Sequence, residues 1–505
     1  MAASPRSSRY GVRLFPDGEL IAAFFAASVA LMRVAAAGAA AAGSALAAPA
    51  GALLAAAGGV ALLLLALILA YASSGTALWL SRAHLEPHST PAATLHSQLR
   101  HRRSVGSAMP CPYPDAWYAV ALSAELAVGD IVDATVCGRS LVIFRPAGGR
   151  PAALDAYCTH MGAHLAHGGG RLTEDGCIRC PFHGWCYDAS GKLVRTETGD
   201  APPAGSDLRA WPVMERNGVI SVWMSASGHR GRPPSVPSSS AALTGTAAGA
   251  GIGEGAAALD KLTAALEVAA GAPEDERPWF EPPVFPEMDS GAFVYHGCSE
   301  HIVSALLFEL PENGSDVGHL TALHTNFVVA ALRPLLSHKW AASWRADEAQ
   351  PHLARLRIVE SMVLLGVTLP GAVQVEITQV GPSQVFFSFL LPGVGRLAMV
   401  ETVTPLAPTT QRTLHAIYAA PHVPRIVAKA LLAGVVRAYE QDLPVWAHKR
   451  YVAQPRLTAS EGAIAVYRRW VRQFIKSPQA ISFADAQKAQ LRLDLGLPED
   501  TPLSW

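Results

Sequence analysis

Two short segments of the chain carry cysteine and histidine residues at spacings that suit a metal cluster. They read Cys158-x-His160 and Cys180-x-x-His183, and 19 residues separate His160 from Cys180. In a [2Fe–2S] cluster with mixed ligands, two thiolates bind one iron and two imidazoles bind the other. Because a neutral imidazole donates less charge than a thiolate, such a cluster accepts an electron readily and can pass it on. The spacing therefore predicts a cluster bound by these four residues.

Other readings of the same cysteines are a zinc site and a redox dithiol. Cys177 and Cys180 form a Cys-x-x-Cys pair, which by itself is typical of either. A zinc ribbon usually has a second such pair, whereas the partner segment here is Cys-x-His, which favours the cluster. The chain has seven cysteines, an odd number, and four lie between 158 and 186. This fits metal binding in a reducing compartment better than a disulfide framework, and Cys177 and Cys186 are then expected to be buried thiols.

A second constellation follows about 130 residues further on, and reads Asn313-x-x-Asp316-x-x-His319-x-x-x-x-His324. Two histidines and a carboxylate with open coordination positions form the ligand set of many non-haem Fe(II) oxygenases. On a helix, Asp316 and His319 would share a face. His319 and His324 are five residues apart, so we expect the helix to end or widen between them. A histidine pair of this kind is also common on protein surfaces, and the third ligand must come from elsewhere in the chain.

Composition divides the chain into five regions, and the expected fold class is α+β. A run of short β-type segments with glycine turns indicates a small all-β domain, and mixed patterns follow it. The predicted strands are 140–144, 218–223, 374–380 and 384–389, and the predicted helices are 424–446 and 460–474. The expected regions are a membrane anchor segment (1–82), a linker (83–112), the β-domain (113–225), a low-complexity insertion (226–278) and a C-terminal α+β domain (279–505).

The N-terminal region contains the strongest candidate for a membrane span. No charged residue occurs between Arg33 and Arg82, and the leucine-rich stretch 51–71 has about the length needed to cross a bilayer, roughly 20 residues. A weaker candidate runs over 20–48, and basic residues flank the pair, which predicts a hairpin with both flanks in the cytosol. A single transmembrane helix and an organelle transit peptide are the alternatives. Acidic and basic residues balance at 40 each, which gives no indication of nucleic-acid binding.

Together the two constellations resemble the Rieske-type oxygenase family. Within it they are most similar to cholesterol 7-desaturases of the Neverland type. The similarity runs from about residue 110 to the C-terminus, and the insertion and the 19-residue gap between the cluster loops depart from the family pattern without touching a ligand. The segments that carry the similarity are 158–165, 180–185, 309–320, 439–451 and 467–470.

The resemblance implies roles for further residues. Asp442 would be the carboxylate ligand of a mononuclear iron beside His319 and His324; the alternative is a carboxylate on a helix surface. Asp316 would hydrogen-bond His183 of one cluster and His319 of a neighbouring iron site. Asn313 would lie near the iron without binding it strongly. The C-terminal domain would then be a catalytic domain in which helices and an antiparallel sheet hold this iron.

The resemblance also implies the reaction and its partners. Electrons from NAD(P)H would arrive through a separate flavin- or ferredoxin-type reductase, and O2 would serve the 7,8-desaturation of cholesterol or a related sterol. The chain would form a homotrimer at a membrane, expected to be the endoplasmic reticulum with the catalytic part in the cytosol, or alternatively in a plastid. Three other functions stay open: a steroid ring hydroxylase, a chlorophyll-pathway oxygenase of plastids and a non-catalytic Rieske electron carrier.

Overall fold

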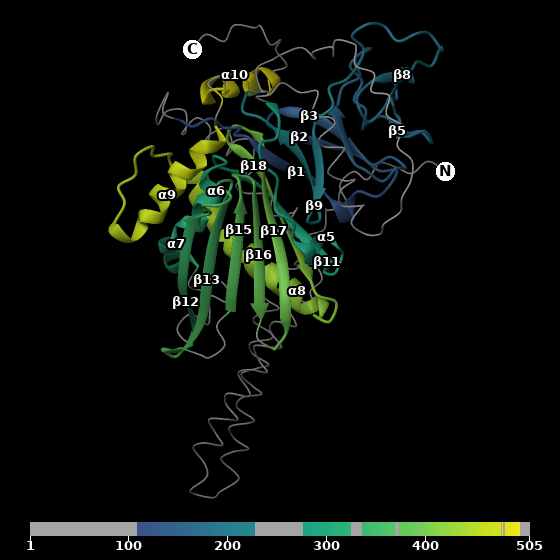
Figure 1. Cartoon of the computed structure of the whole chain (residues 1–505). Coiled ribbons are helices and arrows are strands. Elements are labelled where there is room, and N and C mark those ends of the chain that lie inside the picture. The colour runs from purple at the N-terminus through teal and green to yellow at the C-terminus, as the bar shows by residue number, and fades with distance from the viewer. Residues whose placement is uncertain are drawn as a thin grey trace, which may run out of the picture.

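The structure is a computed structural model that describes residues 109–227, 276–324, 336–368, 373–391, 393–475, 477 and 480–494. It contains an all-β domain followed by an α+β domain (Figure 1). The predicted anchor segment, and most of the predicted linker and insertion, lie outside the described residues. Within the described ranges, no helix combines the length and the apolar character that crossing a membrane requires.

The all-β domain is built from three small antiparallel sheets. The predicted strands at 140–144 and 218–223 are confirmed as β3 and β10. An Asn217-Gly218 turn with φ angles of 54° and 76° joins β9 to β10, and its left-handed backbone matches the twist of the paired strands. The strands are β1 (Ala116–Leu122), β9 (Val213–Arg216) and β10 (Val219–Met224); β2 (Ile131–Val136), β3 (Arg139–Phe144) and β4 (Ala152–Asp155); and β5 (Arg171–Leu172), β6 (Ile178–Arg179), β7 (Cys186–Tyr187) and β8 (Leu193–Arg195).

The α+β domain is an eight-stranded antiparallel sheet with helices packed on one of its faces (Figure 1). The predicted strands at 374–380 and 384–389 are confirmed as β15 and β16. In the order of the sheet, the strands are β11 (Val294–Ser304), β18 (Thr410–Ala419), β17 (Gly395–Ala407), β16 (Gln384–Leu391), β15 (Val373–Val380), β13 (Leu353–Leu364) and β12 (Leu336–Ala346), with β14 (Val367–Thr368) paired to β13.

The helices of this domain position the second constellation. The long helix α8 packs along β11 and β18, and its apolar face is buried through Leu432, Leu443 and Trp446. It confirms the predicted helix at 424–446, and α9 with its flanking turns confirms the one at 460–474. The helices are α5 (Pro286–Asp289), α6 (Glu309–Glu312), α7 (Val317–Leu323), α8 (Arg425–His448), α9 (Gly462–Val471) and α10 (Phe483–Asp494).

The opposite face of the large sheet packs against the all-β domain. Ser383 Oγ and Gln384 Nε2 both donate to the carbonyl of Trp117, at 2.8 and 3.0 Å, and the apolar residues of the two domains form one continuous core. The Tyr418 hydroxyl donates to the carbonyl of Gly218 at 3.3 Å. A Cβ added at Gly218 would lie only 2.2 Å from the hydroxyl oxygen of Tyr418. These contacts fix the all-β domain rigidly to the sheet.

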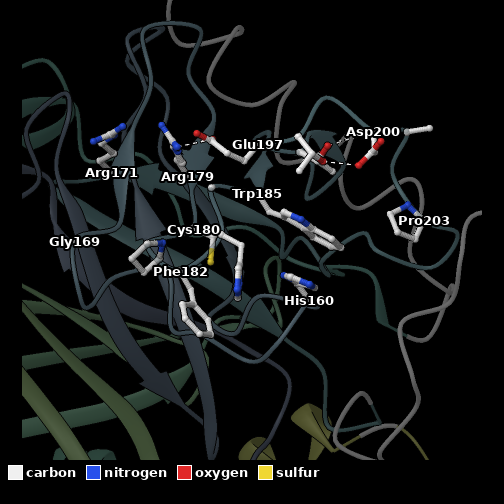
Figure 2. A pocket seen from close by; sticks show the side chains of 16 residues that line it. His160, Gly169, Arg171, Arg179, Cys180, Phe182, Trp185, Glu197, Asp200 and Pro203 are labelled. Carbon is white, nitrogen blue, oxygen red and sulfur yellow. Dashed lines mark hydrogen bonds and ion pairs between the residues drawn. The ribbon is translucent and has the colours of Figure 1, made fainter.

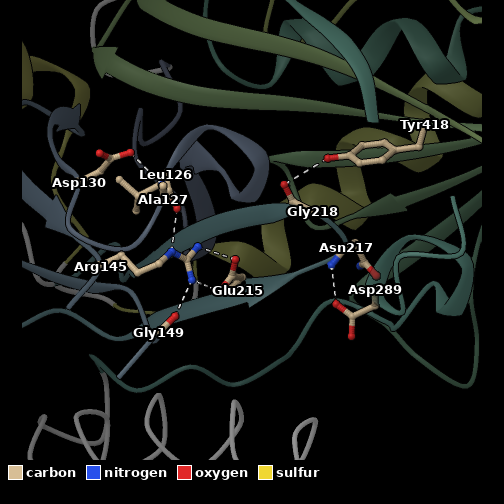
Figure 3. A network of polar contacts seen from close by, with 10 residues as sticks. All are labelled: Leu126, Ala127, Asp130, Arg145, Gly149, Glu215, Asn217, Gly218, Asp289 and Tyr418. Carbon is tan, nitrogen blue, oxygen red and sulfur yellow. Dashed lines mark hydrogen bonds and ion pairs between the residues drawn. The ribbon is translucent and has the colours of Figure 1, made fainter. Parts of the chain in front are cut away.

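A polar network strengthens the same region of the all-β domain (Figure 3). Arg145 forms a two-pronged ion pair with Glu215, at 2.8 and 2.7 Å, and also donates to the carbonyl of Leu126 at 2.8 Å. Beside it, the amide of Asn217 donates to Asp289 of the α+β domain at 3.0 Å. Paired guanidinium and carboxylate groups of this geometry are among the stronger polar contacts, so the loops around β9 and β10 are well anchored.

Candidate metal centres

The two predicted cluster segments fold into matched loops. In each one, a glycine four residues after the cysteine donates its amide to that cysteine's carbonyl: Gly162 to Cys158 at 2.9 Å and Gly184 to Cys180 at 3.2 Å. Both glycines have left-handed φ angles, 72° and 68°, which other residues rarely adopt. The repeated turn presents one thiol and one imidazole from each loop.

The structure brings the four predicted residues together, with the two cysteines buried and the two histidines nearer the surface. Cys158 and Cys180 are each 3% exposed, whereas His160 is exposed and His183 half-buried. The two imidazole rings lie 4.5 Å apart, centroid to centroid, at 71° to each other. Two buried thiols behind two outward imidazoles are the donor set that a mixed-ligand [2Fe–2S] cluster requires. The residues therefore fit the group, with its histidine side toward the surface.

Two aromatic residues support the cluster loops, and the sequence spacing did not reveal their roles. The Tyr187 hydroxyl lies 3.2 Å from Cys158 Sγ and 3.0 Å from Thr159 Oγ1, and the Trp185 ring stacks on His160 at 4.5 Å. Burial raises the pKa of the Cys158 thiol, so the positive charge of bound iron would be needed to hold it as a thiolate. With a cluster bound, the Tyr187 hydroxyl could only donate to the Cys158 thiolate, and such a hydrogen bond would shift the reduction potential.

A hollow of about 630 Å³ opens beside the two histidines (Figure 2). His160, His183 and Trp185 line it, and an ion pair between Arg179 and Glu197 stands on its rim. Phe182, between the two loop ligands Cys180 and His183, is 60% exposed at the same place. The two candidate histidine ligands are therefore accessible from outside this chain.

The second site combines α7 with α8. Ligand atoms of His319, His324 and Asp442 all lie within 4.8 Å of one another, and His324 Nε2 is 3.4 Å from Asp442 Oδ1. Two ligand atoms, each about 2.1 Å from a metal and at right angles, lie about 3 Å apart. His324 and Asp442 are 3% and 7% exposed, so Asp442 is no surface carboxylate. The three residues fit a mononuclear iron with open positions.

Local structure explains how α7 delivers its two histidines. The Asp316 carboxylate caps the helix by accepting the backbone amide of His319 at 3.2 Å, and the main-chain carbonyl of Asp316 accepts the His319 ring Nδ1 proton. The helix ends at Leu323, and His324 follows with φ −99° and ψ 12°, as the five-residue spacing predicts. In this chain the Asp316 carboxylate thus contacts the main chain of His319, whereas the main-chain carbonyl of Asp316 contacts the His319 ring.

In both candidate ligand histidines an acceptor engages Nδ1, which leaves Nε2 for a metal. His319 uses Nδ1 for the carbonyl of Asp316, and His324 uses Nδ1 for Gln441 Oε1 at 3.0 Å. Burial lowers the pKa of His319, which favours the neutral ring that binds metal. Burial also acts to lower the pKa of His324, but the Asp442 and Gln441 contacts outweigh it and raise that pKa. Metal binding would displace the proton on Nε2 of His324.

Sequence reasoning missed Gln441 as a partner of His324. The residue lies beside Asp442 in a segment that carries the family resemblance, but only the tertiary fold shows that it reaches the His324 ring. Asn313 lies in the turn before α7, where its main-chain carbonyl accepts the Asp316 amide at 3.2 Å. Its place near the iron stays a prediction.

Ion pairs fix the segment before α7 against the later helices. Glu309 Oε1 lies 3.3 Å from Lys449 Nζ at the end of α8, and Glu312 forms a two-pronged pair with Arg468 of α9 at 2.6 and 3.0 Å. Glu309 is almost fully buried, and this burial raises its pKa. The two sequence segments that supply the candidate iron ligands are therefore joined directly by the Glu309–Lys449 ion pair.

Comparisons with known proteins match both domains of the chain. Residues 116–212 match the model of the Rieske [2Fe–2S] domain, and residues 272–475 match the C-terminal domain of 3-ketosteroid 9alpha-hydroxylase. The chain is 32% identical over 398 residues to "Cholesterol 7-desaturase nvd" of Bombyx mori, which covers 77% of this chain and 75% of the relative. The chain belongs to the Rieske-type oxygenase family. The Xenopus laevis protein of the same name is 30% identical over 397 residues, covering 76% and 77%.

A bacterial relative extends the comparison. The probable 3-ketosteroid-9-alpha-monooxygenase oxygenase component of Rhodococcus rhodochrous is 23% identical over 373 residues, covering 72% of this chain and 80% of that one. As a Rieske-type oxygenase, the chain is an oxidoreductase with a [2Fe–2S] cluster and a mononuclear iron, and it works with O2 and a separate reductase. When bound, the cluster supplies electrons one at a time and the mononuclear iron supplies O2 activation.

Proposed function

We propose that this Rieske oxygenase removes two hydrogens from cholesterol or a closely related sterol and creates the 7,8 double bond. The reaction balances as sterol, O2, NAD(P)H and one proton giving dehydrosterol, NAD(P)⁺ and two waters. The triad of His319, which is half-buried, and the buried His324 and Asp442 carries the proposal. Two histidines and one carboxylate are the ligand set that would leave open positions on a mononuclear iron. The 32% identity to a protein named as a cholesterol 7-desaturase supports the choice of substrate.

The chain's own residues have distinct tasks in this proposal. Cys158, Cys180, His160 and His183 hold the cluster, and the outward imidazoles give electrons a way in or out. Asp442 and the two histidines hold the iron, while the carbonyl of Asp316 and the amide of Gln441 orient the histidine rings. We assign Asn313 and Asp316 to the surroundings of the reacting centre, as the family resemblance implies.

The working assembly is proposed to be a homotrimer in which one chain's cluster serves a neighbour's iron. Figure 1 supports this, because β5 and β8, which flank the cluster loops, lie across the molecule from α7. The half-open His183 ring and the hollow beside it leave room for a neighbour. The Asp316 carboxylate of that neighbour would then accept a hydrogen bond from His183, and the two sites would be linked electronically.

Membrane attachment through residues 1–82 is part of the proposal. The apolar stretch 51–71 and the water-insoluble substrate support it. We place the enzyme at the endoplasmic reticulum with its catalytic part in the cytosol, with a plastid as the alternative. The functional divisions are proposed to be a Rieske domain at 113–225 and a catalytic domain at 279–505.

Steroid hydroxylation is the second candidate function. The match of residues 272–475 to a 3-ketosteroid 9alpha-hydroxylase domain favours it, and the same iron site serves either outcome. The two differ in whether the substrate loses a second hydrogen or gains an oxygen.

The test is to incubate the full chain in membranes with a generic ferredoxin reductase system, NADPH and cholesterol, and to analyse the sterols by mass spectrometry. A product two hydrogens lighter, with conjugated-diene absorbance, supports desaturation. A product one oxygen heavier identifies a hydroxylase. The Asp442→Ala variant is the control and should give neither. Conversion of other steroids but not of cholesterol would overturn the proposed substrate.

A further inference from the structure

The two histidines of the iron site are oriented by different kinds of acceptor. The His319 Nδ1 proton goes to the main-chain carbonyl of Asp316, which the start of α7 fixes in place. The His324 Nδ1 proton goes to a side-chain amide, Gln441 Oε1, at 3.0 Å. A main-chain carbonyl is present whatever the sequence, whereas a side-chain acceptor depends on one residue type. The geometry of His324 is therefore the one that a single substitution can alter.

Consecutive residues of α8 hold the two nitrogens of the His324 ring. Gln441 contacts Nδ1, and Asp442 Oδ1 lies 3.4 Å from Nε2. A neutral imidazole carries one ring proton, and the nitrogen that carries it cannot bind a metal. Nε2 lies beside Asp442, the other candidate ligand, and would bind the metal. The ring proton must therefore stay on Nδ1, which needs an acceptor. The ring is only 3% exposed, so water is a poor substitute for that acceptor.

We propose that Gln441 is a positioning residue of the iron site: its amide oxygen selects the Nδ1–H form of His324 and directs Nε2 at the metal. The inference rests on the iron site of the proposed function, but not on the sterol. Losing the acceptor would leave a buried N–H without a partner, or let the ring turn and place the proton on Nε2. Either outcome weakens metal binding.

Packing keeps Gln441 at this position. Tyr439, Leu443 and Trp446 are buried in the apolar core that the sheet shares, which fixes the rotation of α8 about its axis. The residue before Gln441, Glu440, also faces β11, and its Oε1 lies 3.8 Å from His301 Nε2. Because the helix cannot turn, a shortened or apolar side chain at 441 has no neighbour on α8 that would replace it.

The test measures Fe(II) affinity in the full chain, after a mild chelator has removed the mononuclear iron and left the cluster in place. Fe(II) is titrated back, and the EPR signal of its nitric oxide adduct reports occupancy. Gln441→Leu removes the acceptor at similar volume, and Gln441→Glu keeps an acceptor. The matched control is Gln374→Leu, because Gln374 Oε1 accepts an exposed hydrogen bond from Arg357 at 3.0 Å in β15.

Loss of a hydrogen-bond partner of a metal ligand typically costs 10- to 100-fold in affinity. Gln441→Leu should therefore bind Fe(II) about 10- to 100-fold more weakly, while Gln441→Glu and Gln374→Leu stay near the wild type. The visible spectrum of the cluster should not change in any variant. If Gln441→Leu loses that spectrum, Gln441→Asn repeats the test with an amide that is one methylene too short, and weaker binding is again expected.

Two results would overturn the inference. One is wild-type affinity in Gln441→Leu or, where that variant loses the cluster, in Gln441→Asn. The other is a loss in Gln441→Glu as large as in Gln441→Leu, which would mean that the acceptor is not the cause. A wild-type chain that binds no Fe(II) would be a different failure, since it would remove the iron site and the proposed function with it.

Discussion

The two metal sites of this oxygenase are built in opposite ways. The cluster residues lie between 158 and 183 on two loops, and each loop is closed by its own glycine turn. The iron residues come from α7 and α8, and only the packing of those helices against the sheet brings His324 to Asp442. A site made of local turns depends little on distant packing, whereas a site between helices depends on every contact that holds them in register.

The largest expected effect separates the sites by function. Asp442→Ala removes a ligand from the iron and should abolish NADPH-dependent turnover, while the spectrum of the cluster stays that of the wild type. Sterol product by mass spectrometry and visible absorbance of the same sample measure both sides. Unchanged turnover would show that Asp442 is no iron ligand, and the contrast between a local cluster site and an iron site between helices would fail.

A substitution at the other site should change only the reduction potential of the cluster. His183→Cys replaces an outward imidazole with a thiolate, so the added negative charge should lower the reduction potential. The expected fall is a few hundred millivolts, from the Rieske range toward the roughly −400 mV of all-cysteine clusters. Redox titration followed by EPR measures it, and Fe(II) affinity at the other site should be unaffected. A potential within the range of the wild type would show that His183 is no ligand.

The dependence of the iron site on packing is tested at Lys449. Lys449→Met leaves the buried Glu309 without its cation, which should cost about 2 kcal/mol in the free energy of unfolding, since Lys449 is only partly buried. Urea unfolding followed by tryptophan fluorescence gives the value. Arg437→Met is the control: Arg437 is 62% exposed in its pair with Glu440, and the loss should be well under about 1 kcal/mol. Equal losses in the two variants would contradict the packing argument.

Glu309 also predicts a pH dependence. Burial raises its pKa in the folded chain above the unfolded value, so the folded state keeps the proton longer as pH rises. Its contribution to stability is therefore fully present below the unfolded pKa and is lost as pH rises through the folded one. Glu309→Gln should remove this slope, and urea unfolding of both proteins from acid to neutral pH would show the curves diverging as pH rises. Parallel curves would contradict it.

The smallest effect is a contrast between two glycines. Gly184→Ala puts a Cβ at a left-handed φ of 68° and 2.4 Å from Glu197 Oε2, which should cost about 1–2 kcal/mol and loosen the cluster loop. Gly318→Ala in α7 meets only Asp316 Oδ1 at 3.2 Å and should change stability by less. Thermal unfolding followed by cluster absorbance compares them; a larger loss for Gly318→Ala would reverse the contrast.

The difference between the sites also decides what the sequence could predict. The four candidate cluster residues could be predicted from spacing, because a local turn maps directly onto the chain. Strands β3, β10, β15 and β16 could be predicted from short apolar runs. Asp442 came only from the family resemblance, since no spacing connects α8 to α7. Gln441 and Tyr187 were missed because polar residues take such roles only once tertiary packing has chosen their neighbours.

The iron content of the purified full chain tests the central claim most directly. An oxygenase with both sites should contain about three irons per chain, show the EPR signal of a reduced Rieske cluster, and give a nitric oxide adduct of Fe(II) that Asp442→Ala lacks. About two irons per chain, with the cluster signal alone even after Fe(II) is supplied, would contradict the account and identify the chain as an electron carrier.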